Sequence, residues 1–153
     1  MLVVSDTTAI TSLSKIGRAE ILSRLFRQIV IPNAVRDELL KYHPSLPAFL
    51  EVKALQDTGQ LVPLLRDLEA GEAEAILLAL ELRADALLID DRRGRRIAEE
   101  RGVRCMGLAG ALLLAKKRGI VPLVREILDE LEKGARFYLK AEIKVRVLES
   151  AGE

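Results

Sequence analysis

Acidic side chains stand where apolar stretches of the chain end or where helical stretches begin. They are Asp6, Glu38, Glu72 with Glu74, and Asp90 with Asp91. In an α/β protein the carboxyl ends of parallel strands gather along one edge of the sheet. Asp6 and Asp91 share that edge if their strands are neighbours, and Glu72 can face it from the first turn of the helix leading into the Asp91 strand. The spacing therefore predicts a cluster of carboxylates at the edge where such folds do chemistry.

Crowded carboxylates repel one another, and a divalent cation would resolve that repulsion. Oxygen ligands without histidine or cysteine select Mg²⁺ or Mn²⁺ over Zn²⁺. Such an ion polarises a phosphodiester, activates a water and stabilises the leaving oxygen. His43 and Cys105 are the only residues of their types, which excludes a disulfide within the chain and zinc sites built from several cysteines or histidines. We therefore interpret the acids as a site for metal-assisted hydrolysis.

Each acid also has a purely structural explanation. Asp6 can be the N-cap of the helix that follows it, and Asp90-Asp91 can be a turn that starts the next helix. Glu38 and Glu74 can be solvated residues on mixed helix faces. The hypothesis of a site rests on all these acids together, because without a site every one of the structural explanations would have to hold at once.

Arginines follow the last pair of acids: they are Arg92, Arg93, Arg95 and Arg96. The functional interpretation is a basic patch beside the metal that binds the phosphate backbone of a nucleic acid. The alternative is an amphipathic helix face on which the arginines pair with Glu99 and Glu100 at spacings of three and four.

Short apolar runs alternate with helical stretches along the chain. The expected strands are 2–4, 29–31, 51–55, 86–89 and 103–106. The expected helices are 9–15, 19–26, one starting near 33, 61–68, 72–83, 93–101, 108–117, 122–133 and 137–149. This alternation predicts an α/β fold, a three-layer α/β/α sandwich with a central, mostly parallel five-stranded sheet. We expect one domain over 1–153, with a core over about 2–118 and C-terminal helices over about 119–150.

The composition sets limits on the class of protein. Of 153 residues, 50% are hydrophobic and 31% are charged, which is typical of a globular chain. Aromatic residues make up only 3%, so an aromatic platform for base stacking is not expected. The net charge of +1 neither favours nor excludes nucleic acid, because a local patch matters more than the sum. No signal peptide or membrane span is visible, and we expect a cytoplasmic protein.

Four segments resemble the PIN-domain family of nucleases. They are Val4-Ser5-Asp6-Thr7-Thr8-Ala9, Pro32 through Leu39, Glu72 through Leu82, and Leu88-Ile89-Asp90-Asp91. The resemblance covers about residues 2–118, and the whole chain is similar to the stand-alone prokaryotic, VapC-like group of that superfamily. It implies a metal-dependent ribonuclease with a parallel α/β/α sandwich and an acidic pocket for Mg²⁺ or Mn²⁺. Many such proteins are toxins that a small antitoxin protein inhibits, and many are homodimers.

Carried over, the resemblance implies that the metal ligands and catalytic residues are Asp6, Glu38, Glu72 and Asp91, with Thr8 near the site. The chain departs from the family at two of its positions. Glu72 stands where many relatives have Asp, and Ile89 stands where they have a hydroxyl residue. The doubled acids also leave Glu74 and Asp90 as alternate ligands, although the helix face and the strand register favour Glu72 and Asp91.

The expected function is cleavage of RNA phosphodiesters, as the toxin of a toxin–antitoxin pair. The alternative is a non-catalytic PIN-fold module that binds protein or RNA. A phosphatase of the haloacid dehalogenase type would need a second aspartate two residues after Asp6, where Thr8 stands.

Overall fold

Five parallel strands form the central sheet of the computed structural model, which describes residues 1–153. The strands are β1 (Leu2–Ser5), β2 (Gln28–Ile31), β3 (Leu50–Val52), β4 (Ala86–Leu88) and β5 (Cys105–Met106). Their order across the sheet is β3-β2-β1-β4-β5, and every neighbouring pair is parallel. The chain builds outward from β1 to β3 and then crosses to the other side of β1. The strand order therefore reverses between β1 and β4, which is where α/β sheets form a crevice.

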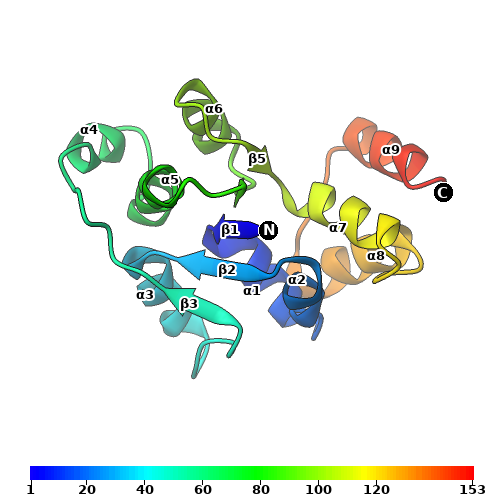
Figure 1. Cartoon of the computed structure of the whole chain (residues 1–153). Coiled ribbons are helices and arrows are strands. Elements are labelled where there is room, and N and C mark those ends of the chain that lie inside the picture. The colour runs from blue at the N-terminus through cyan, green and yellow to red at the C-terminus, as the bar shows by residue number, and fades with distance from the viewer.

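Helices cover both faces of this sheet (Figure 1). They are α1 (Thr7–Lys15), α2 (Glu20–Leu25), α3 (Asn33–Tyr42), α4 (Leu61–Leu65), α5 (Ala70–Leu82), α6 (Arg92–Glu100), α7 (Leu108–Lys117), α8 (Val124–Ala135) and α9 (Ala141–Ser150). In Figure 1, α4, α5 and α6 lie on one side of the sheet, and α1, α2 and α8 lie on the other. The predicted three-layer α/β/α sandwich is confirmed.

Alternating side chains of the strands divide the core into two clusters. Val3 and Leu88 belong to the larger cluster, on the face covered by α1, α2, α7 and α8. Val4 and Leu87 belong to the smaller cluster, which the buried side of α5 completes. Successive side chains of a strand point to opposite faces, so a short apolar run is buried on both sides. This is why the strands read as continuous apolar runs in the sequence.

Several predicted boundaries are wrong by a few residues. The edge strand β3 ends at Val52 rather than at residue 55, because β2 ends where Pro32 has no N–H to donate. Helix α5 begins at Ala70, so Glu72 is its third residue rather than its first. Helix α4 ends at Leu65 rather than at residue 68.

The last predicted helix begins later than expected, at Ala141 instead of residue 137. The preceding helix ends in a left-handed residue, Arg136, with a φ of 53°. The Phe137 N–H then donates to the Leu131 carbonyl, which closes α8 and turns the chain away. The segment before α9 is therefore not helical.

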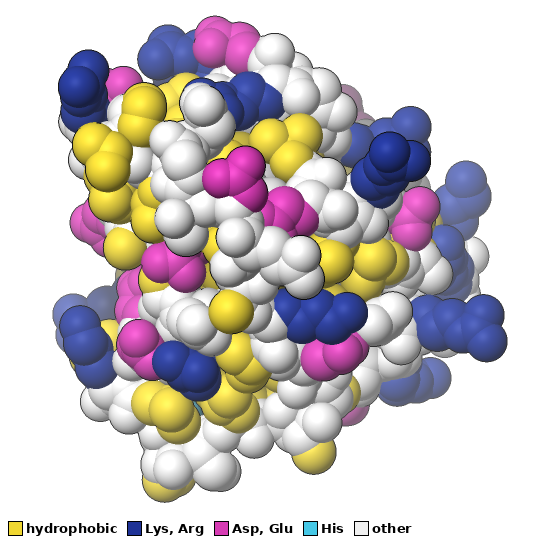
Figure 2. All heavy atoms as spheres, turned by 60° about the vertical axis from the view of Figure 1, so that its left-hand side comes forward, with side chains coloured by type: hydrophobic (Ala, Val, Ile, Leu, Met, Phe, Trp, Pro, Cys, Tyr) yellow, Lys and Arg dark blue, Asp and Glu magenta, His cyan; other side chains and the backbone are white.

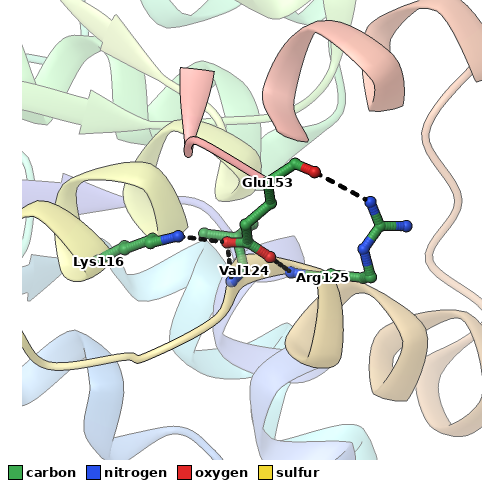
Figure 3. Close-up of polar contacts among 4 residues, drawn as sticks. All are labelled: Lys116, Val124, Arg125 and Glu153. Carbon is green, nitrogen blue, oxygen red and sulfur yellow. Dashed lines mark hydrogen bonds and ion pairs between the residues drawn. The ribbon is translucent and has the colours of Figure 1, made fainter. Parts of the chain in front are cut away.

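The C-terminal helices pack on the rest of the chain. Helix α8 contacts α1 and α7, and α9 contacts α7. The Glu153 carboxylate, after α9, joins α7 and α8 (Figure 3). It accepts hydrogen bonds from the Val124 N–H at 2.7 Å and the Arg125 N–H at 3.0 Å, and it forms an ion pair with the Lys116 ammonium at 2.9 Å. It thus caps the N-terminus of α8 from a distant part of the chain. None of the helices combines the length and the apolar character that a membrane span needs.

Candidate active site

Asp6 directly follows β1, at the centre of the sheet. Its backbone N–H donates to the Leu88 carbonyl of β4 at 2.9 Å, which fixes the residue beside the crevice between β1 and β4. The residue occupies the N-cap position of α1, but its side chain forms no capping hydrogen bond. Only 6% of Asp6 is exposed. The N-cap explanation therefore does not account for this carboxylate, which is left facing the crevice.

Glu38 reaches the same crevice from the middle of α3. Its Oε2 accepts a hydrogen bond from the Thr7 hydroxyl at 3.0 Å. Gly71 permits this approach: a Cβ there would lie 3.2 Å from Glu38 Oε2 and 3.6 Å from Asp6 Oδ1. The missing side chain at the start of α5 thus leaves room for two carboxylates from other elements.

Glu72 and Asp91 come from the starts of α5 and α6. Glu72 Oε1 accepts a hydrogen bond from the Glu69 N–H at 3.3 Å, and Asp91 Oδ2 accepts one from the Gly94 N–H at 2.7 Å. Both acids therefore help to cap a helix. A Cβ on Gly94 would lie 3.3 Å from Glu72 Oε2 and 3.4 Å from Asp91 Oδ2. The two carboxylates meet over this glycine, so the structural role and a place in the site are compatible.

These four carboxylates line one pocket of about 230 Å³ that has no hydrophobic residue in its wall. The complete lining is Asp6, Thr7, Thr8, Glu38, Glu69, Glu72 and Asp91. Figure 2 shows acidic side chains gathered in the middle of one face, with Lys and Arg side chains around them. The structure thus brings together acids that are up to 85 residues apart in the sequence, which is the separation of Asp6 and Asp91 (91 minus 6). We call this cavity the acidic pocket.

Two carboxyls of the acidic pocket, Asp6 and Glu72, have a raised pKa. Burial raises the pKa of Asp6 to about 6, and the negative charges of nearby acids add to this effect, while the neighbouring Thr7 N–H opposes it. Burial also raises the pKa of Glu72 to about 7; repulsion from Asp91 and Asp6 and a hydrogen bond to Asp91 act in the same direction. Without a metal ion, the protonated form of Glu72 therefore persists to a higher pH than in an ordinary glutamate.

The two alternate acids make hydrogen bonds elsewhere. Glu74 Oε1 accepts from the Ala34 N–H at 3.2 Å, in the first turn of α3. Asp90 accepts from the Leu108 N–H, at 3.1 Å to Oδ1 and 3.3 Å to Oδ2, and so caps α7. Burial raises the pKa of Asp90, against the opposing effects of the Leu108 N–H and the Arg95 charge. Neither Glu74 nor Asp90 lines the acidic pocket.

The donor atoms of the acidic pocket fit a hard divalent cation. All are carboxylate or hydroxyl oxygens, which are the ligands of Mg²⁺ and Mn²⁺. Neither Gly71 nor Gly94 has a side chain between these carboxylates, and an added Cβ would lie 3.2–3.6 Å from their oxygens. The acids do not form a ready-made cage, however, since no three of them lie in a metal-holding arrangement.

A groove of about 750 Å³ opens beside the acidic pocket and shares Glu69, Glu72 and Asp91 with it. Its arginines are Arg66, Arg92, Arg93 and Arg96. Three of the four predicted basic residues thus line what we call the arginine groove. Arg95 does not: it points towards Gly107, where a Cβ would lie 3.2 Å from its Nη1, and its charge acts on Asp90. Arg92 and Arg96 also border a second cavity behind α6.

Some residues of the site were not predicted from the sequence. Arg66 lies just after α4, far from the arginine run, and no local pattern marks it. Thr7, rather than Thr8, makes the hydrogen bond to Glu38. Gly71 and Gly94 did carry a signal, because each stands within three residues of an acid at a helix start.

One protein-family model matches almost the whole chain. The family model described as "DUF3368: PIN domain" matches residues 2–153. The chain belongs to the PIN-domain family. A solved structure with a similar fold is that of a PilT N-terminus domain protein from the hyperthermophilic archaeon Sulfolobus solfataricus: the TM-score is 0.56 at 23% identity, over 75% of this chain and 93% of that one. No curated protein sequence matches significantly.

This membership agrees with the resemblance of the four sequence segments and with the parallel three-layer fold. PIN domains are generally nucleases, and they typically use divalent metals. The chain therefore has a nuclease fold, and its acidic pocket lies at the strand-order reversal where α/β proteins bind ligands.

Proposed function

We propose that this PIN-domain protein is an endoribonuclease that hydrolyses RNA phosphodiesters with Mg²⁺ or Mn²⁺. One observation carries the proposal: four carboxylates from separate segments converge on a wholly polar pocket that opens into an arginine-lined groove. Oxygen ligands favour these cations, and arginines favour a phosphate backbone. The choice of RNA over DNA rests on the resemblance to prokaryotic ribonuclease toxins.

In this proposal Asp6, Glu38, Glu72 and Asp91 hold the metal. The ion would supply the chemistry, polarising the phosphate and activating a water. Thr7 orients Glu38 through its hydroxyl. The arginine groove binds and orients the strand so that its phosphate lies at the acidic pocket. Because Glu74 and Asp90 cap other helices, we propose that they are not ligands.

The test is cleavage of a fluorescein-labelled single-stranded RNA by the purified protein. Cleavage should require Mn²⁺ or Mg²⁺, stop with EDTA and be lost in Asp6→Asn. The matched control is Asp37→Asn, which removes a carboxylate from the exposed side of α3, next to Glu38 in sequence, and should cleave as the wild type does. RNA that stays intact with either metal would contradict the proposal.

We further propose that the protein is the toxin of a toxin–antitoxin pair and forms a homodimer, as the resemblance implies. Exposed apolar side chains support a protein partner near the site: Leu65 borders the arginine groove, and Tyr42, which is 73% exposed, stands at the end of α3. Co-purification with the product of a neighbouring small reading frame tests the first proposal, and light scattering tests the second.

A second candidate function is a binding module without catalysis. One observation favours it: no three of the acids stand in a metal-holding arrangement. In that case, RNA would bind along the arginine groove while neither Mn²⁺ nor Mg²⁺ would bind to the wild-type protein. Metal titration by calorimetry separates the two candidates.

A further inference from the structure

A second polar cavity adjoins the acidic pocket on the side away from the arginine groove. It has a volume of about 250 Å³ and shares Thr7, Thr8 and Glu38 with the acidic pocket. Its remaining lining is Thr11, Ser12, Lys15 and Tyr42. We call it the hydroxyl pocket. The arginine groove, the acidic pocket and the hydroxyl pocket thus form one continuous track across the carboxyl edge of the sheet.

We propose that the hydroxyl pocket binds a ribose-phosphate unit of the RNA strand, on the far side of the cleaved phosphate from the arginine groove. This inference rests on the proposed function for the position of the cleaved phosphate. It adds a second binding site, so that the strand is held on both sides of the acidic pocket.

The chemistry of the lining favours a sugar-phosphate. Four hydroxyl residues of α1 line this pocket. The Thr7 hydroxyl donates to Glu38 and can only accept from a ligand, whereas the other three hydroxyls can also donate, which matches phosphate oxygens and the RNA 2′-hydroxyl. Lys15 is the only cation of the hydroxyl pocket. It takes part in none of the ion pairs of the molecule. Its ammonium is therefore available to a phosphate.

One hydroxyl is left without a partner. Thr11 Oγ1 is buried and forms no hydrogen bond in the protein. A buried hydroxyl is normally satisfied. Because this oxygen is buried, Thr11 must rotate about χ1 to present it to the pocket, and the rotation breaks no hydrogen bond within the protein. Thr11 lies one turn from Thr7 and Thr8 on α1, which places it on the track beside the acidic pocket.

Glu38 is the one acid of the hydroxyl pocket, and it does not oppose this assignment. Its Oε2 accepts the Thr7 hydroxyl and lies near Gly71, on the side of the acidic pocket. A cation held there would offset its charge. A phosphate beside Lys15 would then face the hydroxyls and the ammonium.

The experiment measures binding of a fluorescein-labelled single-stranded RNA to the full chain by anisotropy. Ca²⁺ replaces Mg²⁺ or Mn²⁺ to offset the carboxylates, and a gel of the same samples checks that the RNA stays intact. Lys15→Ala should weaken binding by roughly 3- to 10-fold and lower the magnitude of the log–log salt slope by about 0.7. The matched control is Lys133→Ala, which removes an exposed lysine of α8 and should change neither quantity.

Thr11→Val separates binding from folding. Valine keeps the shape and removes a hydroxyl that the protein does not satisfy, so Tm should equal or exceed that of the wild type. RNA affinity should still fall by roughly 3- to 10-fold. Wild-type RNA binding that neither Lys15→Ala nor Thr11→Val weakens would overturn the proposal, as would the absence of RNA binding by the wild type.

Failure of the nuclease proposal would be seen in a different assay. If the two variants weaken RNA binding but the wild type never cleaves RNA with Mn²⁺, the proposal for the hydroxyl pocket stands and the nuclease proposal is contradicted. If the wild type cleaves RNA but neither variant weakens RNA binding, the nuclease proposal stands and the proposal for the hydroxyl pocket is contradicted.

Discussion

Glu72 and Asp91 meet over Gly94, where a Cβ would lie 3.3 Å from Glu72 Oε2 and 3.4 Å from Asp91 Oδ2. The same Asp91 oxygen accepts the Gly94 N–H at 2.7 Å. One glycine thus positions the cap of α6 and leaves space for the two carboxylates to share. The acidic pocket depends on this absence of a side chain as much as on the acids.

Substitution at Gly94 tests that dependence. The Cβ of Gly94→Ala would lie 2.8 Å from Ile89 Cδ1 as well as against both acids. We expect a destabilisation of about 1–3 kcal/mol from this crowding, less the gain of about 1 kcal/mol that alanine brings to a helix. Mn²⁺ binding should weaken by roughly 10-fold. Thermal denaturation and Mn²⁺ titration measure the two effects.

Gly110→Ala is the matched control, because Gly110 is also helical and its Cβ would meet only the flexible Met106 Cγ at 3.3 Å. It should keep the Mn²⁺ affinity of the wild type. Equal Mn²⁺ binding in Gly94→Ala and Gly110→Ala would show that the space over Gly94 is unimportant.

Mn²⁺ binding should strengthen as the pH rises. Metal ligands must be deprotonated, whereas the pKa is about 6 for Asp6 and about 7 for Glu72. The rise in Tm produced by Mn²⁺ should therefore be larger at pH 7.5 than at pH 5.5. A rise that is the same at both pH values, or larger at pH 5.5, would mean that the metal binds elsewhere.

The metal-free protein should show the opposite trend. Both carboxyls have a higher pKa in the folded chain than their ordinary values of 3.8 and 4.5. The folded state therefore holds more protons than the unfolded state between about pH 4 and 7, and their contribution to stability falls as the pH rises through that window. In EDTA, the Tm of Glu72→Gln should therefore fall less than the Tm of the wild type as the pH rises through this window.

Substitutions of the adjacent acids Asp90 and Asp91 should have opposite effects on cleavage and on stability. Asp91→Asn should lose about 100-fold or more of the metal-dependent cleavage, yet keep its Tm, because asparagine caps a helix as well as aspartate does. Asp90→Ala should keep most of the cleavage but lose the cap of α7, at a cost of about 1 kcal/mol or roughly 2–4 °C in Tm. The reverse pattern would assign the ligand role to Asp90.

The same comparison applies on α5. Glu72→Gln should lose cleavage, and Glu74→Gln should retain it, since the Glu74 carboxylate is bonded to the Ala34 N–H. Cleavage rates at saturating Mn²⁺ measure this difference. Loss of cleavage in Glu74→Gln alone would contradict the assignment.

The contacts of Glu153 with Lys116 and with the start of α8 should weaken in acid. Partial desolvation works against its charge, but the Lys116 ammonium and the N–H groups of Arg125 and Val124 outweigh it and lower the pKa to about 2. A folded-state pKa below the ordinary 4.5 means that this stabilisation is present above about pH 4.5 and is lost as the pH falls to about 2. The Tm difference between the wild type and Glu153→Gln should therefore shrink across that window. A difference that does not change with pH would leave the ion pair without a role in stability.

Much of the fold could be predicted because its signals are local. Apolar runs such as Leu2-Val3-Val4 and the run through β4 to Ile89 are buried on both faces, and they alternate with helices as a parallel sheet requires. Because the carboxyl ends of parallel strands gather at one edge, the same pattern also predicts that Asp6 and Asp91 lie close together.

The choice between the doubled acids and the place of Arg66 could not be predicted, because they depend on long-range contacts that leave no local sequence pattern. The choice between Asp90 and Asp91 turns on the Leu108 N–H, 18 residues after Asp90. Likewise, Glu74 is held by Ala34, 40 residues earlier in the chain. Arg66 joins the arginine groove because α4 and α6 both pack on α5, which brings the chain after α4 to the same groove as the arginines of α6. Hydrogen-bond partners of this kind come from the tertiary structure, so the sequence left both registers open.

The most direct test of the central claim is a crystal structure with Mn²⁺, located by its anomalous scattering. We expect the Mn²⁺ peak inside the acidic pocket, coordinated by oxygens of Asp6, Glu38, Glu72 and Asp91, with Glu74 and Asp90 still bonded to their backbone N–H partners. A peak coordinated by Asp90 or Glu74, or an acidic pocket without Mn²⁺ at a concentration that saturates cleavage, would contradict the claim.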